Sequence, residues 1–322
     1  MQKKLYPMNT AELLDQSVDV YKKSFLVQLA YSAIVSVTAF VLIFVVGIIA
    51  VIIFAFFAGV FYGIGFDANM ATSTIVVIAV GAVLFFVPLL MLWQALYSAG
   101  HILLAKQAFY GEKVRVNVEQ LPKVALRVLS SFAAQILLFV LMLLVLGLIF
   151  FVFAIVFGLL MYPAPLTAGG YFWLGFGLVV ALVVGLGYWI FSNVFSLSVA
   201  VAIFEKRLFF GTITRSWQLV KGEFWKILAI RTLWFVATMV IYYSLYGVVN
   251  LLSVGVLFLA DFFGFAGIVI AMLFNWVTII VSFVMSFAIM PLGGIVQAVI
   301  YFNQRIKKEG LDIEERLERL GS

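Results

Sequence analysis

The sequence has no cysteine and a single histidine, His101, among its 322 residues. Disulfide frameworks, Cys/His zinc sites and thiol nucleophiles are therefore excluded, and almost every catalytic triad that needs a histidine base is disfavoured. Charged residues are also scarce, at 11% of the chain against about 25% in an average soluble domain. We therefore expect no catalytic residues, no metal site and no cofactor, and the chain is not expected to be an enzyme.

Apolar residues dominate instead, at 66% of the chain. Several apolar runs, in which Arg231 is the one Lys, Arg, Asp or Glu, each exceed the roughly 20 residues that a helix needs to cross a bilayer. These runs are 25–57, 75–104, 132–161, 171–204, 227–252 and 267–301. Backbone groups in lipid must be satisfied within their own segment, and the alternating pattern of barrel strands is missing, so each run predicts a helix. The predicted fold class is an all-α integral membrane protein with six transmembrane helices in a single membrane domain, 1–322.

The basic residues indicate how the chain is oriented. All 20 Lys and Arg fall in four groups, at 3–23, 106–127, 206–231 and 305–319. The loops around Asp67, Pro163 and Asp261 contain none. The positive-inside rule then predicts a multi-pass membrane protein with both termini and two loops in the cytoplasm. The basic balance is explained by orientation, and no nucleic-acid partner is expected.

The sequence repeats weakly about every 100 residues. The predicted repeat units and a short cytoplasmic helical tail are 8–105, 116–205, 211–308 and 309–322. Phe25 and Phe224 match at an offset of 199 residues, and Pro88 and Pro291 match at an offset of 203. Because each unit has two spans, successive units enter from the same side, and the axis that relates them is expected to run along the membrane normal.

A short amphipathic segment opens each unit. In the first, Asn9 and Glu12 have the spacing of a capping box, and Leu14, Val18 and Tyr21 form an apolar stripe. We expect these segments to be helices in the interface of the inner leaflet, either as positional anchors or as recognition elements for anionic lipid headgroups or a membrane protein partner. The candidate lipid or partner face consists of Lys22, Lys23, Lys123, Arg127, Arg215, Trp217, Lys221, Arg231 and Arg305.

Polar side chains inside the spans are few. Arg231 lies about one turn or more inside the fifth span, where snorkelling to the interface is the preferred interpretation over a functional charge. His101 is expected at the interface or as a buried, hydrogen-bonded imidazole. Two matched prolines, each followed by a glutamine six residues later, allow either a polar cavity or kinked packing without one. The candidate cavity residues are Pro88, Gln94, Asn193, Pro291 and Gln297.

Two charged segments carry a family resemblance. Residues 215–225 read RSWQLVKGEFW and residues 301–312 read YFNQRIKKEGLD. With the opening segment 12–25, they make the chain resemble the glycerophosphoryl diester phosphodiesterase membrane-domain family, in which R-S-W-x-L-V-x-G-x-F-W precedes the fifth helix and Y-F-D-x-R-x-R-K-E-G-x-D follows the sixth. This chain has Asn303 and Lys307 where the family usually has Asp and Arg.

The resemblance implies a stand-alone bacterial inner-membrane protein. Some members join this region to a soluble phosphodiesterase domain, but the segments outside the spans here reach only about 25 residues, and an independently folded domain needs about 50 or more. Our first hypothesis is a non-catalytic membrane protein that acts through lipid or partner-protein contacts at its cytoplasmic face. The alternatives are a permease or exporter for an apolar or amphipathic substrate, and an anchor for a separately encoded lipid phosphodiesterase. The pattern specifies no oligomeric state.

Overall fold

The computed structural model describes residues 6–63, 68–160, 166–260 and 262–310, and every regular element in these ranges is a helix. Six helices are long and apolar enough to cross a membrane, as predicted. Those that carry the candidate spans are α1 (Thr10–Gly63), α2 (Ala68–Tyr110), α3 (Leu121–Leu160), α4 (Leu166–Val194), α7 (Phe224–Ala260) and α8 (Gly264–Ile289). Three shorter helices are α5 (Ser198–Phe204), α6 (Phe210–Val220) and α9 (Pro291–Glu309). Most of the predicted tail 309–322 and the centres of the three predicted outer loops lie outside the described residues.

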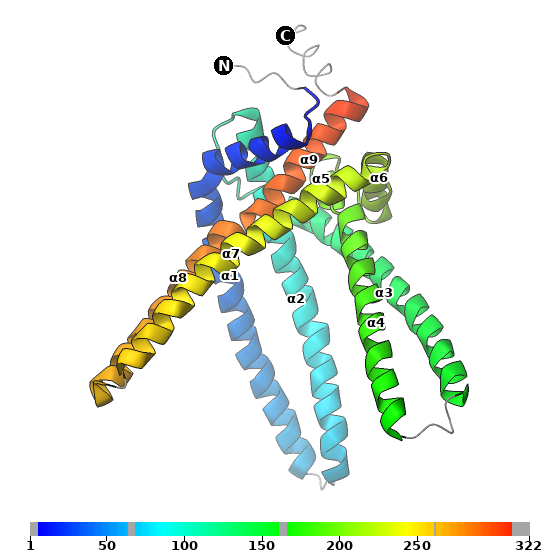
Figure 1. Cartoon of the computed structure of the whole chain (residues 1–322), viewed down its shortest axis with the longest axis vertical. Coiled ribbons are helices and arrows are strands. Elements are labelled where there is room, and N and C mark those ends of the chain that lie inside the picture. The colour runs from blue at the N-terminus through cyan, green and yellow to red at the C-terminus, as the bar shows by residue number, and fades with distance from the viewer. Residues whose placement is uncertain (1–5, 64–67, 161–165, 261, 311–322) are drawn as a thin grey trace.

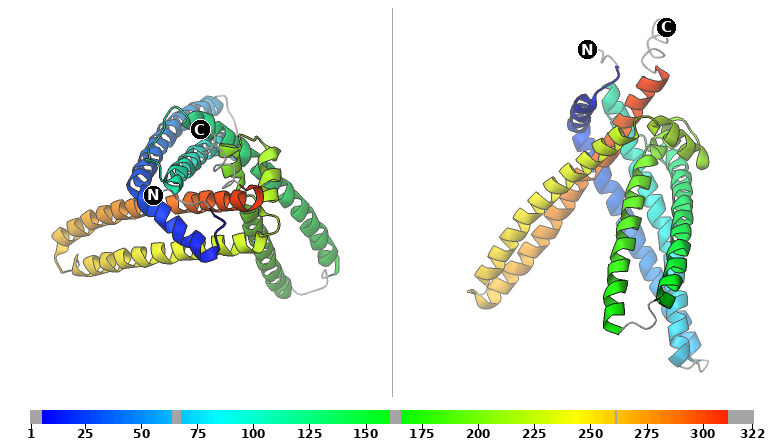
Figure 2. Two further views of the ribbon diagram at one scale, coloured as in Figure 1. Left: turned by 90° about the horizontal axis from the view of Figure 1, so that it is seen from above. Right: turned by 45° about the vertical axis from the view of Figure 1, so that its right-hand side comes forward.

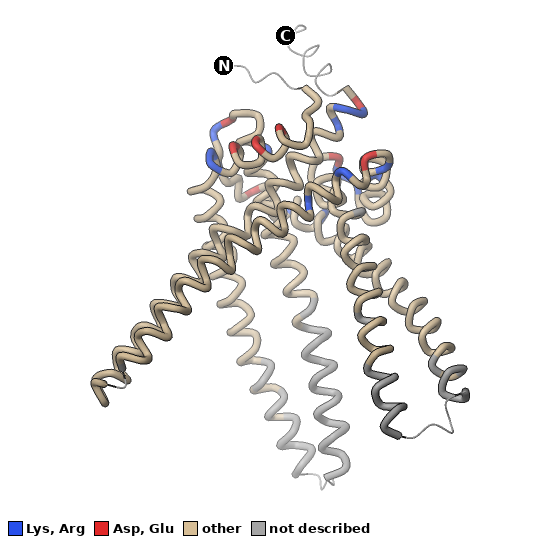
Figure 3. The backbone as a smooth tube through the Cα atoms, viewed as in Figure 1, with Lys and Arg blue, Asp and Glu red and all other residues tan. Residues whose placement is uncertain are grey.

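The long helices form three pairs that extend from one end of the molecule. The pairs α1/α2, α3/α4 and α7/α8 spread apart, whereas α5, α6 and α9 lie together where the pairs converge (Figures 1 and 2). The Lys, Arg, Asp and Glu residues of the described ranges gather at this same end (Figure 3). We call it the charged end: α5, α6 and α9, the last turns of α2, and the first turns of α1, α3 and α7.

The buried core also lies at the charged end. Ile102 of α2, Val201 of α5 and Tyr301 of α9 are fully buried there. The long helices beyond it are exposed, with Leu144 of α3 at 65% and Phe265 of α8 at 82%. Lipid tails are as apolar as these side chains, so no hydrophobic force draws the three pairs together along their length. The tertiary packing that defines the fold is therefore concentrated at the charged end.

Two of the three amphipathic segments are not separate helices. The first forms the opening turns of α1, the second, at 116–129, runs into those of α3, and only the third, with the stripe Ile213, Trp217 and Val220, stands alone as α6. In the first segment Leu13, Ser17 and Val20 are the buried residues, and Val18 of the predicted stripe is 37% exposed. The small Ser17 returns its hydroxyl to the Leu13 carbonyl (2.8 Å), which lets this face pack closely on protein.

The two matched prolines have different structural consequences. Pro88 lies inside α2, which continues through it. Pro291 is the first residue of α9, where its missing N–H costs no helical hydrogen bond, and it separates α9 from α8. Between α6 and α7 the chain reverses at Gly222, whose φ of 94° favours glycine. These breaks bring α6 and α9 together at the charged end.

Candidate functional site: the polar network around helix α9

Helix α9 is the central element of the charged end. Its buried apolar residues Ile295, Val299, Phe302 and Ile306 recur at helical spacing and belong to the core. Its last turn carries Lys307 and Lys308, where positive charge is favoured by the helix dipole. Polar side chains of the same helix reach α6, the segment before α6, and the N-terminal segment. Together these polar contacts form what we call the α9 network.

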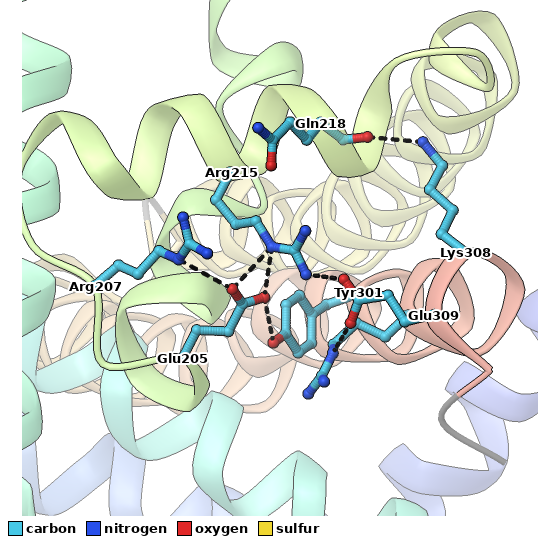
Figure 4. Close-up of polar contacts among 8 residues, drawn as sticks. Glu205, Arg207, Arg215, Gln218, Tyr301, Lys308 and Glu309 are labelled. Atoms are coloured by element: carbon cyan, nitrogen blue, oxygen red, sulfur yellow. Dashed lines mark hydrogen bonds and ion pairs between the residues drawn. The ribbon is translucent and has the colours of Figure 1, made fainter. Parts of the chain in front are cut away.

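One part of the α9 network is centred on the carboxylate of Glu205. Arg215 of α6 donates from Nε to both Glu205 oxygens (2.8 and 3.1 Å), and the hydroxyl of Tyr301 donates to Oε1 (3.1 Å). Arg207 lies 3.3 Å from the same carboxylate. Arg215 also pairs with Glu309 at the end of α9, as Figure 4 shows. A guanidinium from α6 is thus shared between two acids from different segments, which fixes α6 against α9.

A second part joins the α6–α7 turn to α9. Gln304 donates to Glu223 Oε2 (3.0 Å), and Lys307 Nζ lies 2.9 Å from Glu223 Oε1. Partial burial acts to raise the pKa of the Glu223 carboxyl, but the hydrogen bonds from Gln304 and Lys307 and the charges of Lys307 and Lys226 outweigh it and hold the pKa below its ordinary value. Glu223 is therefore an ionised acceptor at neutral pH.

A third contact closes the end of α6. Lys308 Nζ donates to the carbonyls of Gln218 (2.8 Å) and Lys221 (2.6 Å), which are among the unpaired carbonyls at a helix C-terminus. Segments 215–225 and 301–312, which carry the family resemblance, therefore contact each other through their described residues. Sequence spacing alone had not indicated this, because the two segments are about 80 residues apart.

The N-terminal segment is tied to the same helix. The backbone N–H of Met8 donates to Asn303 Oδ1 (2.8 Å), and Asn303 Nδ2 lies 3.5 Å from the Met8 carbonyl. An amide can form both contacts, whereas an aspartate could only accept, which gives a structural role to the asparagine at this position. The predicted capping box is confirmed, since Asn9 and Glu12 exchange backbone-to-side-chain hydrogen bonds of 2.8 and 2.9 Å.

His101 is buried in a hydrogen-bonded chain between α1 and α2. Ser24 gives its hydroxyl hydrogen to a carbonyl one turn earlier (2.7 Å), so the Gln28 amide nitrogen must donate to Ser24 Oγ (3.1 Å). Gln28 Oε1 then faces His101 Nδ1 (2.6 Å), and this assigns the proton to Nδ1. In the neutral ring Nε2 accepts from Ser32 (3.1 Å), which in turn accepts from Tyr97 (3.2 Å). The prediction of a satisfied buried imidazole is confirmed.

The structure divides the predicted lipid or partner face into two groups. Lys22, Lys123, Lys221 and Trp217 are exposed, and none of the three lysines forms an ion pair within the described ranges. The other residues have intramolecular contacts or partial burial. Lys23 pairs with Asp19, Arg215 and Arg305 pair with Glu309, Arg231 donates to the Ser192 carbonyl, and Arg127 is half-buried.

Of the predicted cavity residues, Gln94 lines a recess described in the structure. Gln94 lines a recess of about 250 Å³ between α2, α3 and α4, together with Gln135, Tyr188, Ser192 and apolar neighbours. The lining described for this recess contains none of the other predicted residues. Pro88 is exposed, Pro291 and Asn193 are buried, and Gln297 is half-buried on α9.

The network offers little reactive chemistry. Across the described ranges no three His, Asp or Glu side chains lie close enough to hold a metal ion. The polar groups of the α9 network are mostly paired with one another, so the arrangement holds helices together and leaves the exposed lysines at its edge. Comparison of the chain with protein-family models, curated proteins and solved structures finds no match.

Proposed function

We propose that the protein is a non-catalytic, multi-pass protein of the bacterial cytoplasmic membrane that contacts anionic lipid headgroups with its charged end. One observation carries this proposal. Three exposed lysines have no ion pair in the part of the chain that the structure describes: Lys22, twelve residues after the start of α1, Lys123 in the first turn of α3, and Lys221 between α6 and α7. Anionic headgroups attract such lysines by about 1 kcal/mol each, and the exposed Trp217 suits the same interface.

The predicted threefold repeat is part of this proposal, and polar contacts at the charged end support it. In each proposed unit a polar side chain in the first long helix, or directly before it, contacts the last helix of that unit. The contacts are Gln28 with His101 (2.6 Å), Gln135 with Ser198 (2.7 Å) and Glu223 with Gln304 (3.0 Å). The first two units share SFxxQ, since 24–28 read SFLVQ and 131–135 read SFAAQ, whereas the third, EFWKI at 223–227, has only the phenylalanine in common. In this register Lys22 matches Lys221, two residues before each segment, whereas the second unit has Leu129 there and its exposed Lys123 lies eight residues before Ser131.

The transport hypothesis has weaker support. It depends on paired glutamines beside a cavity, and the recess at Gln94 does not include Gln297 in its described lining. The hypothesis of an anchor for a lipid phosphodiesterase rests on the family resemblance alone. We further propose that the chain belongs to this family, that it resides in a bacterial cytoplasmic membrane and that both of its termini lie in the cytoplasm.

The experiment compares the thermal stability of the full-length protein in nanodiscs of phosphatidylcholine with and without phosphatidylglycerol. We expect the anionic lipid to raise the melting temperature at low salt and to lose most of this effect at high salt, because the exposed charges are screened. Replacing Lys22, Lys123 and Lys221 together by glutamine should remove the lipid effect. The matched arginine variant should keep it. Equal responses of the wild type and the glutamine variant to phosphatidylglycerol would refute the proposal.

A further inference from the structure

Arg231 is a cation without an acid in the α4–α7 contact. It lies seven residues after the first residue of α7, and Nη1 donates to the carbonyl of Ser192 on α4 (3.2 Å). No Asp or Glu of the described ranges pairs with it. A guanidinium has five N–H donors, and a charge in apolar surroundings is costly unless it is paired. The observed contact accounts for one of these donors.

The Ser192 contact has a structural explanation of its own. Ser192 is in the last turn of α4, where carbonyls lack helical partners, and Arg231 satisfies one of them. This contact also shows that the side chain reaches another helix, which plain snorkelling to water does not require. Capping one carbonyl leaves the positive charge itself uncompensated.

The neighbours of Arg231 and Ser192 also have unused hydrogen-bonding groups. Trp234, one turn after Arg231 on α7, has a buried Nε1 with no hydrogen-bond partner among the described residues. Asn193, the residue after Ser192, has a buried Oδ1 that likewise has no hydrogen-bond partner among the described residues. Buried polar atoms are nearly always satisfied, so unmet groups near an unpaired cation indicate a missing polar ligand. The Trp234 N–H is a donor that suits a phosphate oxygen, whereas Asn193 Oδ1 is an acceptor and would need a donor such as a hydroxyl of the headgroup.

Apolar space adjoins this contact. Ser192, whose carbonyl accepts from Arg231, also lines the recess of about 250 Å³ between α2, α3 and α4. Its walls include Phe132, Phe139 and Phe191. A ligand that suits both features has a phosphate at one end and a hydrocarbon chain at the other.

We propose that Arg231 binds the phosphate of an anionic glycerophospholipid at the α4–α7 contact, with an acyl chain of that lipid in the recess that begins at Ser192. Guanidinium groups bind phosphate through two parallel hydrogen bonds, which a lysine cannot reproduce. The location of Arg231 within a span favours a lipid over free phosphate. This inference rests on the proposed contact with anionic lipid, and it adds one specific site to the diffuse attraction of the exposed lysines.

The experiment measures lipid retained by the full-length protein after delipidation in mild detergent, by native mass spectrometry, with phosphatidylglycerol or phosphatidylcholine added back. The wild type should retain one phosphatidylglycerol even at high salt. Arg231→Gln should bind it about tenfold or more weakly, because a charged hydrogen-bonded contact is lost. Arg231→Lys should recover part of the binding, and Lys113→Gln, at an exposed lysine outside this site and outside the three proposed headgroup contacts, serves as the matched control that should retain the lipid.

A wild-type measurement keeps the inference testable if Arg231→Gln does not fold. Phosphatidylglycerol should raise the melting temperature of the wild type in detergent at high salt, whereas inorganic phosphate or glycerol phosphate at the same concentration should not. Stabilisation by inorganic phosphate alone would assign the site to a free anion and overturn the lipid assignment. Lipid retention that is equal in the wild type and the Arg231 variants would overturn the site. In that case, loss of the low-salt lipid effect in the triple lysine variant would still leave the proposed function standing.

Discussion

Glu205 offers the sharpest test of how the charged end is held together. The change Glu205→Gln keeps the shape of the side chain and removes the charge that Arg215 and Tyr301 share. The glutamine amide would also place a donor group next to the guanidinium in one of its two orientations. Arg215 would keep Glu309 as its acidic partner, so the variant should be weakened rather than unfolded.

The expected loss follows from the burial of the pair. The side chains of Glu205 and Arg215 are 12% and 18% exposed. Exposed ion pairs contribute about 0–1 kcal/mol, and breaking a buried pair costs about 3–5 kcal/mol. A mostly buried pair that keeps a second acid should lie between these limits, at about 2–3 kcal/mol. At about 2 °C per kcal/mol for a chain of this size, the melting temperature should fall by about 4–6 °C.

The assay is thermal unfolding in mild detergent, followed by tryptophan fluorescence. The double variant of Glu205→Gln and Arg215→Gln should lose less than the sum of the single losses, because both remove the same interaction. Lys23→Gln is the control, since the Lys23–Asp19 pair is about half exposed and its loss should cost about 0.5 kcal/mol or less. An effect of Glu205→Gln no larger than that of Lys23→Gln would refute the reasoning.

Two further predictions concern packing and pH. A Cβ at Gly100 would lie 2.0 Å from Tyr31 Cζ, whereas a Cβ at Gly147 would meet nothing within 4 Å. Gly100→Ala should therefore cost about 1–3 kcal/mol of stability, and Gly147→Ala should be neutral or slightly stabilising. Equal melting temperatures of the two variants would contradict this. Glu223 has a lowered pKa, so its contact with Lys307 stabilises the fold above the ordinary glutamate pKa and is lost as the pH falls through the lowered value. The stability difference between the wild type and Glu223→Gln should accordingly be constant near neutral pH and shrink on acidification, and a difference that grows at low pH would contradict the assignment.

Sequence patterns predicted the all-helical architecture, because a long apolar segment in a bilayer must satisfy its backbone hydrogen bonds within itself. Long apolar runs predicted six spanning helices, and the grouping of Lys and Arg predicted that charge would gather at one end. Both depend on composition along the chain rather than on contacts. The capping box at Asn9 and Glu12 was also predictable, because its partners are three residues apart.

Sequence patterns did not indicate which faces pack on protein, because neighbours from distant segments decide this. The first amphipathic segment buries the face with Leu13 and the small Ser17 and leaves Val18 exposed. Arg215 pairs with Glu205 and Glu309, which the fold brings near it, whereas Arg305 pairs with Glu309 four residues later on the same helix. The SFxxQ pattern at 24–28 and 131–135 was a local signal for the polar contacts of Gln28 and Gln135. Patterns of charge and hydropathy do not reveal such contacts.

The sequence by itself therefore determined an all-helical fold with six helices long and apolar enough to cross a membrane and with charge gathered at one end (Figure 3), because hydrogen bonding and solvation in a bilayer depend on the residue types along each segment. Only the tertiary structure decided which charges remain available. Helix α9 brings Glu309 to Arg215 and Lys307 to Glu223 across about 80 residues or more of chain, and the three helix pairs leave Lys22, Lys123 and Lys221 exposed. Whether a charge faces a partner or the solvent depends on distance in space, which spacing along the chain does not specify.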